Sequence, residues 1–182
     1  VFDSGRPRPV HIELPLDVIT AEADHVRRAV VPTSSRPAPD PAKIVEAAQL
    51  LRQAKRPLVV LGGGAQHASA SARAVIEKIG ALAATTINGK GILTPDHPLS
   101  LGSTLPQPPV LEELTHADVV LAVGTELGET DTLLFDSRLR LGGKVIRVDI
   151  DPEQLTRNVL AEVAILSDSD LALRALDREL RS

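Results

Sequence analysis

Leu58-Val-Val-Leu-Gly-Gly-Gly64 joins four apolar residues to three glycines. A short apolar run without a polar position is typical of a strand that is buried on both faces. Three glycines directly after it predict a tight turn, and the following residues, 69–79, have the pattern of a helix. Further short runs of this kind, most of them ending in turn residues, occupy residues 83–87, 119–123, 144–148 and 163–166.

Helical patterns separate these runs. Pro41 follows Asp40, a good capping residue, and predicts a helix over residues 41–54. A shorter helix is expected near residues 110–114, and Asp168 is placed to cap a last helix that ends near residue 180. Buried strands that alternate with helices predict an α/β fold, a doubly wound parallel sheet of about six strands with helices on both faces. This is the Rossmann-like type of domain that includes DHS-like NAD/FAD-binding domains.

The first part of the chain differs in composition. Residues 9–14 alternate between apolar and polar side chains, which predicts a strand, and residues 17–31 read as a weak helix or an extended tail. The stretch 32–41 is rich in proline and hydroxyl side chains, as linkers are. We therefore expect one part over residues 1–38 and a separate domain over residues 39–182.

Composition excludes several classes of function. The 182 residues contain no cysteine, so disulfides, thiolate metal sites and a cysteine nucleophile are ruled out. The formal net charge of −4 argues against nucleic-acid binding. The apolar runs are too short to span a membrane and no secretory signal precedes them, so a cytoplasmic location is expected. The chain begins at Val1 and has no methionine, which suggests a piece of a longer enzyme.

Four turns that follow predicted strands could bind a ligand. Parallel strands end at one edge of a sheet, and glycine-rich turns there let backbone amides approach a phosphate. The candidate cofactor-binding residues are those of the four turns: Gly62, Gly63, Gly64, Asn88, Lys90, Gly124, Thr125 and Asp149.

Each turn also has a purely structural interpretation. The three glycines do not match the dinucleotide fingerprint, because His67 occupies the third glycine position, and they could simply form a tight turn. Lys90 could meet a phosphate or be a solvated lysine in a loop that is not a P-loop. Asp149 could accept hydrogen bonds from a ribose, whereas Asp151 before Pro152 is better explained as a helix cap.

No catalytic set emerges from the sequence. Glu126, Glu129 and Asp131 could do acid–base work or bind a metal, but no partner base or ligand accompanies them, and a solvated acidic loop explains them as well. The five histidines are scattered without a zinc-like spacing.

Five phrases, in order, resemble those of thiamine-diphosphate-dependent enzymes of the acetolactate synthase and 2-oxo acid decarboxylase class. The resemblance covers essentially the whole chain. The phrases are Gly5-Arg-Pro-Arg-Pro-Val-His-Ile-Glu-Leu-Pro-Leu-Asp17, Arg56–Gly64, Asn88-Gly-Lys-Gly-Ile-Leu-Thr-Pro-Asp-His-Pro98 with Leu101-Gly102, Ala117–Gly124 and Val148-Asp-Ile-Asp-Pro152.

The resemblance implies that this chain is the central domain of such an enzyme, preceded by the tail of the pyrimidine-binding domain. Thiamine diphosphate and Mg²⁺ would then bind outside this chain, and no catalytic residue would lie within it. Some members of the class hold FAD or ADP in this domain, with an arginine in the turn where Glu126 stands here, and an acidic residue there would repel a pyrophosphate. Two phrases, at residues 6–17 and 124–131, look most similar to decarboxylases of the 2-oxo acid derived from arginine.

The resemblance also implies partners, namely the remaining domains of the same enzyme and other subunits of a homodimer or homotetramer. Two alternatives stay open: an independent NAD(P)- or FAD-binding module, and a pure subunit-interaction domain.

Overall fold

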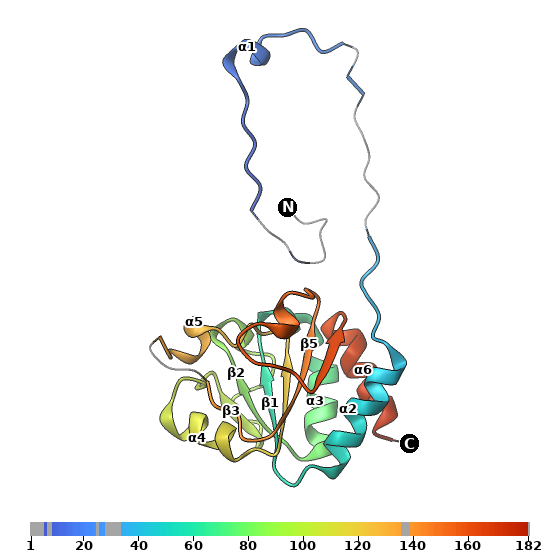
Figure 1. Cartoon of the computed structure of the whole chain (residues 1–182), viewed down its shortest axis with the longest axis vertical. Helices are drawn as coiled ribbons and strands as arrows, with labels where there is room; N and C mark the ends of the chain where they lie inside the picture. The colour runs from blue at the N-terminus through green and yellow to red at the C-terminus, as the bar shows by residue number, and fades with distance from the viewer. Residues whose placement is uncertain (1–5, 7–8, 25, 28–33, 136–138, 182) are drawn as a thin grey trace. The chain divides into compact units, whose positions relative to one another are not determined.

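The computed structural model describes residues 6, 9–24, 26–27, 34–135 and 139–181 (Figure 1). The chain divides into two units, residues 1–36 and residues 37–182. In the first unit, one short helix, α1 (Leu16–Ile19), is present, and none of its residues is buried. The second unit contains every other helix and strand of the described residues.

The second unit is built on a sheet of six parallel strands in the order β3-β2-β1-β4-β5-β6. The chain adds strands to one side of β1 and then crosses to its other side, so the order reverses between β1 and β4. The strands are β1 (Pro57–Leu61), β2 (Leu82–Thr85), β3 (Ser100–Gly102), β4 (Val119–Val123), β5 (Lys144–Asp149) and β6 (Val163–Leu166).

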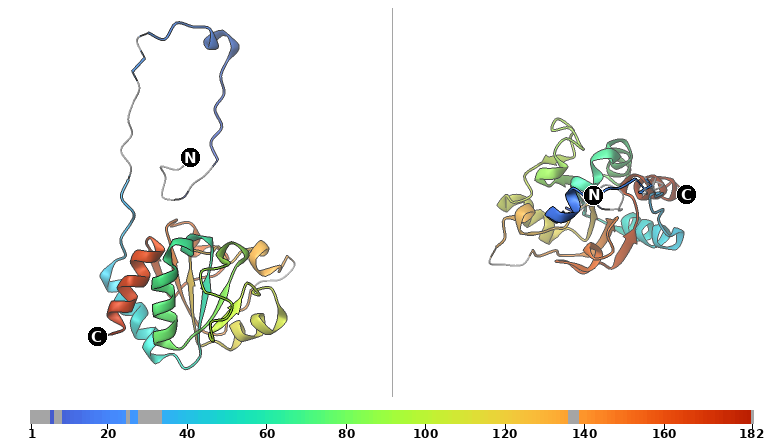
Figure 2. Two further views of the ribbon diagram at one scale, coloured as in Figure 1. Left: turned by 180° about the vertical axis from the view of Figure 1, so that it is seen from behind. Right: turned by 90° about the horizontal axis from the view of Figure 1, so that it is seen from above.

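Helices cover both faces of the sheet (Figures 1 and 2). On one face lie α2 (Pro41–Gln53), α3 (Ser69–Ile79) and α6 (Ser169–Glu179), and on the other lies α4 (Pro108–His116). A short helix of about one turn, α5 (Glu129–Thr132), follows β4. Three 3₁₀ helices complete the unit: η1 (Gly63–Ala68), η2 (Ile87–Gly89) and η3 (Gln154–Thr156).

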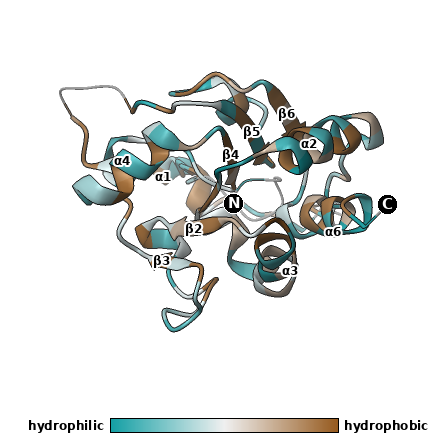
Figure 3. Cartoon of the chain, turned by 90° about the horizontal axis from the view of Figure 1, so that it is seen from below, coloured by the Kyte–Doolittle hydropathy of each residue, from teal (hydrophilic) through white to brown (hydrophobic). Residues whose placement is uncertain are grey.

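Side-chain alternation along the strands divides the core in two. Val59 and Leu61 of β1 join the cluster under α2, α3 and α6, whereas Leu58 and Val60 join the cluster under α4. Figure 3 shows the strands as predominantly hydrophobic and the helices as mixed. The predicted doubly wound α/β fold is thus confirmed, with a core of aliphatic residues.

Capping residues begin two helices where the sequence predicts them. Asp40 accepts a hydrogen bond of 2.8 Å from the backbone N–H of Ala42 at the start of α2. Asp168 accepts two from Asp170 and Leu171 at the start of α6, at 3.0 and 3.2 Å. Among the described residues, no helix has the length and apolar character needed to cross a membrane.

Two expectations about strands are wrong. Residues 9–14 form no strand, because none of the described residues pairs with them, and a strand needs a partner for its backbone groups. The sixth strand of the sheet is instead β3, which the sequence analysis assigned to a loop. The expected helix or tail over residues 17–31 is helical only at Leu16–Ile19, and residues 25 and 28–31 of it lie outside the described residues.

Candidate functional site

The candidate residues follow four neighbouring strands at one edge of the sheet. Gly62, Gly63 and Gly64 follow β1, and Gly124 and Thr125 follow β4. Asn88 and Lys90 follow β2, and Asp149 is the last residue of β5. Because β1 and β4 flank the reversal in strand order, this is the position at which open α/β sheets form a ligand-binding crevice.

The turns after β1 and β4 pack directly on each other. The N–H groups of Gly62 and Gly64 donate to the carbonyl oxygens of Val123 and Gly124, at 2.9 and 3.0 Å. A Cβ atom on Gly62 would lie 2.2 Å from the carbonyl oxygen of Gly124, and one on Gly124 would lie 2.6 Å from the carbonyl carbon of Gly64. These glycines are therefore needed for close approach of protein backbone to protein backbone, and the amides of Gly62 and Gly64 already have acceptors.

The turn after β2 joins the same assembly. A Cβ atom on Gly89 would lie 2.2 Å from the carbonyl oxygen of Leu61. The side-chain amide of Gln66 donates to the carbonyl oxygen of Asn88 at 2.7 Å, which ties η1 to η2. Lys90 is exposed beside these contacts.

The two aspartates at the end of β5 and just after it organise their own turn. The carboxylate of Asp149, which is buried, accepts a hydrogen bond from the N–H of Asp151 at 2.9 Å. Asp151 in turn accepts one from the N–H of Glu153 at 3.0 Å, as a cap at the start of a helical turn does. Both carboxylates thus have structural contacts at this edge.

A histidine–carboxylate pair also lies at this edge. Nε2 of His67, in η1, is 3.0 Å from Oδ2 of Asp168, the cap of α6. The side chain of Asp168 is 3% exposed and that of His67 is 43% exposed. The two residues lie 101 positions apart in the chain, so nothing local in the sequence signals their pairing.

Arg147 was not identified from the sequence. It lies in the middle of β5 and is 1% exposed. Its guanidinium donates to the carbonyl oxygens of Arg157, at 2.5 Å, and Thr125, at 2.8 Å, with a longer contact of 3.4 Å to Val159. Burial lowers the pKa of Arg147, and the nearby carboxylate of Asp149 opposes that shift. The sequence feature that could have pointed to Arg147 is its position as a single basic residue inside the apolar run 145–148.

The acidic residues after β4 do not assemble a metal site. Burial raises the pKa of Asp131, and a hydrogen bond from Thr125 at 3.3 Å opposes the shift. Glu129 is exposed. In the part of the chain that the structure describes, no group of three or more His, Asp or Glu side chains could hold a metal ion.

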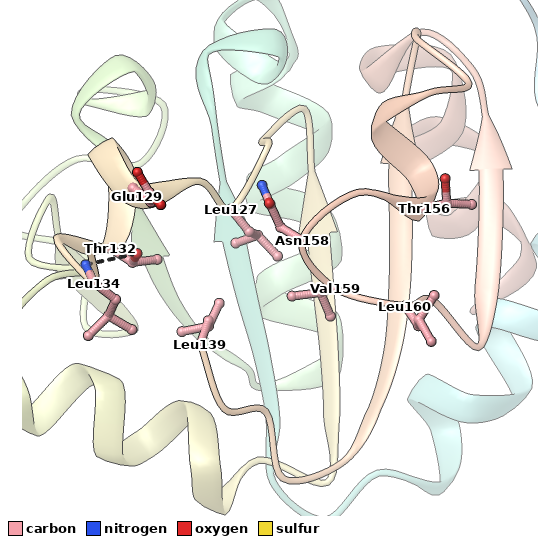
Figure 4. Close-up of a pocket in the computed structure, with 9 residues that line it drawn as sticks. All are labelled: Leu127, Glu129, Thr132, Leu134, Leu139, Thr156, Asn158, Val159 and Leu160. Carbon is pink, nitrogen blue, oxygen red and sulfur yellow. Dashed lines mark hydrogen bonds between the residues drawn. The ribbon is translucent and has the colours of Figure 1, made fainter. Parts of the chain in front are cut away.

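A pocket of about 380 Å³ lies beside this acidic segment (Figure 4). One wall comes from the segment after β4 and the other from the segment after η3. Among the described residues of its lining, five of nine are aliphatic and one, Glu129, is charged. The lining residues are Leu127, Glu129, Thr132, Leu134, Leu139, Thr156, Asn158, Val159 and Leu160.

Comparison with known families gives one clear match. The family described as "Thiamine pyrophosphate enzyme, central domain" matches residues 44–176. This range contains all six strands and all of the helices from α3 to α5.

Two curated relatives illustrate the similarity. A protein of Pseudomonas aeruginosa named "Probable 2-ketoarginine decarboxylase" is 43% identical over 177 residues, which cover 97% of this chain and 31% of that protein. Acetolactate synthase isozyme 1 large subunit of Escherichia coli is 33% identical over 187 residues, which cover 97% of this chain and 32% of that protein. The chain thus spans about a third of the length of these relatives.

Two solved structures share the fold. A protein from Mycobacterium smegmatis named "putative thiamin diphosphate-dependent enzyme" superimposes with a TM-score of 0.69 at 26% identity, over 84% of this chain and 30% of that one. Benzoylformate decarboxylase from Polynucleobacter necessarius superimposes with a TM-score of 0.67 at 23% identity, over 88% and 30%.

Proposed function

Because the chain belongs to the thiamine pyrophosphate enzyme family, as the central domain of such enzymes, we propose that it is a structural domain of a larger thiamine-diphosphate-dependent enzyme. The observation that carries this proposal is the packing at the strand-end edge. The turns after β1 and β4 bond to each other at this edge, so the amides of Gly62 and Gly64 already have protein acceptors. An edge whose turns bond to each other in this way suits a domain that supports others.

The reaction we propose for the whole enzyme is decarboxylation of a 2-oxo acid, with 2-ketoarginine as the substrate. Sequence identity supports this choice, since the chain is 43% identical to the relative named for 2-ketoarginine and 33% identical to an acetolactate synthase. Thiamine diphosphate supplies carbanion stabilisation in such reactions. The described residues offer no acidic cluster for Mg²⁺, so we place the thiamine diphosphate and Mg²⁺ sites in domains outside this chain.

An activity assay tests the assignment. The 182-residue chain, given thiamine diphosphate, Mg²⁺ and 2-ketoarginine, is expected to release no CO₂. The gene product that carries this chain together with the domains its relatives have is expected to release CO₂ from 2-ketoarginine faster than from pyruvate. Turnover by the chain alone would contradict the structural role, and a preference for pyruvate would contradict the substrate.

A second candidate function is nucleotide binding at the strand-end edge. Its support is the convergence of the predicted residues on one edge, with exposed Lys90 among them. The geometry favours it less, because the amides of Gly62 and Gly64 already donate to backbone carbonyls. Calorimetric titration of the chain with ADP, FAD and NAD(H) decides between the two: micromolar binding of one of them would replace the structural proposal with this one.

We further propose the remaining domains of the same enzyme as partners, and a homodimer or homotetramer as the assembled form. The division of the chain near residue 36 supports an assignment of residues 1–38 to the end of the preceding domain. Light scattering on the gene product tests the assembly, and a monomer there would exclude it. The cytoplasmic location stays a prediction from the sequence.

A further inference from the structure

The pair Asn88-Gly89 is of a kind at which proteins deamidate without an enzyme. The backbone nitrogen of the glycine attacks Cγ of the asparagine, since glycine has no side chain to hinder it. A bond from this nitrogen to Cγ forms, the bond from Cγ to the side-chain nitrogen breaks, and ammonia leaves with the proton of the glycine N–H. Water then opens the resulting imide to aspartate or isoaspartate. The side chain of Asn88 is exposed, so water has access to it.

The attack requires the peptide unit between Asn88 and Gly89 to rotate. Both residues lie in η2, whose backbone is helical, and the nitrogen of Gly89 must leave its helical position to reach the side chain of Asn88. The same rotation moves the carbonyl oxygen of Asn88, because a peptide unit is planar and turns as one body. A restraint on either atom therefore opposes the attack.

Both polar atoms of this peptide unit are restrained by hydrogen bonds. The N–H of Gly89 donates to the carbonyl oxygen of Thr86 at 3.0 Å and to the hydroxyl oxygen of Thr86 at 3.2 Å. The carbonyl oxygen of Asn88 accepts a hydrogen bond of 2.7 Å from the side-chain amide of Gln66. Closure of the imide ring would break these contacts on both sides of the peptide unit.

Packing adds to this restraint. Gly89 is buried, and a Cβ atom on it would lie 2.2 Å from the carbonyl oxygen of Leu61, so its backbone lies directly on the end of β1. An isoaspartate at position 88 would carry its own Cβ in the main chain and lengthen the turn by one bond. The close contact with β1 leaves little room for this extension, so the product is disfavoured as well as the attack.

We propose that the fold protects Asn88 from deamidation by holding the peptide unit between Asn88 and Gly89, and that Asn88 becomes a modification site only when this turn opens. Close packing on β1 requires the glycine, and the hydrogen bonds of Thr86 and Gln66 suppress the reaction that the glycine would otherwise permit. This protection arises within the second unit and does not depend on the function proposed above.

Peptide mapping by mass spectrometry tests the proposal. The full chain and a synthetic peptide of residues 82–94 are incubated at the same mildly alkaline pH, and the aspartate and isoaspartate formed at position 88 are measured in each. Deamidation in the folded chain is expected to be at least about tenfold slower, which corresponds to an opening free energy of about 1.4 kcal/mol. Equal rates in the chain and the peptide would overturn the proposal.

Two glutamine variants locate the protection. Gln66→Met removes the donor to Asn88 and is expected to speed deamidation about three- to tenfold, as the loss of one hydrogen bond would. Gln49→Met, at an exposed position of α2, is the matched control and is expected to leave the rate unchanged. Both glutamines are exposed, so both variants should fold.

Hydrogen exchange connects the reaction to opening of the turn. In Gln66→Met the amide of Gly89 should exchange faster by the same factor as deamidation, while the amides of β4 stay unchanged. Equal deamidation in the two glutamine variants, or faster deamidation without faster exchange at Gly89, would contradict protection by this peptide unit.

Discussion

Close backbone packing at the strand-end edge depends on a position without a side chain, Gly62. A Cβ atom on Gly62 would lie 2.2 Å from the carbonyl oxygen of Gly124 and 2.6 Å from Cβ of Thr125, so the two turns would have to separate. We expect Gly62→Ala to cost about 3 kcal/mol, the upper end for overpacking, and to lower Tm by about 6–12 °C.

Gly128→Ala provides the control in the same part of the fold. At Gly128 the nearest atom to an added Cβ is 3.8 Å away, and φ is −82°. Its Tm should stay within about 2 °C of the parent in thermal circular dichroism. Equal melting of the two variants would show that the turns do not pack as described.

Arg147 is a second residue whose role is structural. Its guanidinium supplies donors to the carbonyl oxygens of Thr125 and Arg157 in two different segments. Arg147→Met keeps most of the volume but removes the guanidinium donor from both oxygens, although the oxygen of Arg157 keeps the N–H of Val159 at 2.7 Å. We expect this loss to cost about 2–4 kcal/mol in urea denaturation.

Hydrogen exchange separates this role from simple packing. In Arg147→Met, amides at residues 126–128 and 158–160 should exchange faster, while those of β1 should change only with global stability. Arg147→Lys keeps the charge without the planar fork and should fall between the parent and the methionine variant. Unchanged exchange in the two segments would show that the hydrogen bonds of Arg147 do not stabilise them.

Between elements, Asp118 joins the starts of β1 and β4. Its carboxylate accepts hydrogen bonds from the N–H groups of Lys55 and Arg56, at 2.7 and 2.9 Å. Burial would raise the pKa of Asp118, but these backbone donors outweigh it and hold the pKa below the ordinary 3.8. A lowered folded-state pKa means that the stabilisation is present above pH 3.8 and is lost as the pH falls through the folded-state value.

Asp118→Asn removes this titration. We expect the variant to be less stable than the parent by about 1 kcal/mol at pH 7, a value kept small because the site is partly open to solvent. The difference should shrink below pH 4 as the parent carboxylate becomes protonated. Glu112→Gln, on exposed surface, should show neither effect, and a difference that does not shrink as the pH falls below 4 would contradict the assignment.

At the scale of the whole molecule, the features that could be predicted are local ones. The strands at residues 119–123 and 163–166 and the helix at 69–79 have the expected bounds, because apolar runs and caps are read from neighbouring residues. β3 could not be predicted, since three half-buried edge residues leave no apolar run.

The strand-end site was predictable only as a set of turns. Parallel strands place their carboxyl ends together, so the common edge follows from the fold. The contact of Gly64 with Gly124, like that of His67 with Asp168, joins residues far apart in the chain and has no local signal. The ligand interpretation and the structural one therefore could not be separated before the backbone hydrogen bonds were known.

The boundary of the second unit gives the last prediction. Every described residue of both core clusters lies between Ile44 and Leu180, so removal of residues 1–36 takes away none of these side chains. We expect a chain that starts at Pro37 to keep its Tm within about 2 °C of the parent.

Removal of three more residues should be different, because the carbonyl oxygen of Pro37 accepts hydrogen bonds from the N–H of Asp168 at 2.9 Å and from the hydroxyl of Ser167 at 3.1 Å. Both donors are buried, so a chain that starts at Asp40 should lose about 2 kcal/mol and melt about 4–8 °C lower. Asp40, the cap of α2, is present in both chains, so the difference isolates the Pro37 contacts. Equal melting of the two truncated chains would move the boundary to residue 40, and a large loss in the first would place residues 1–36 inside the cooperative unit.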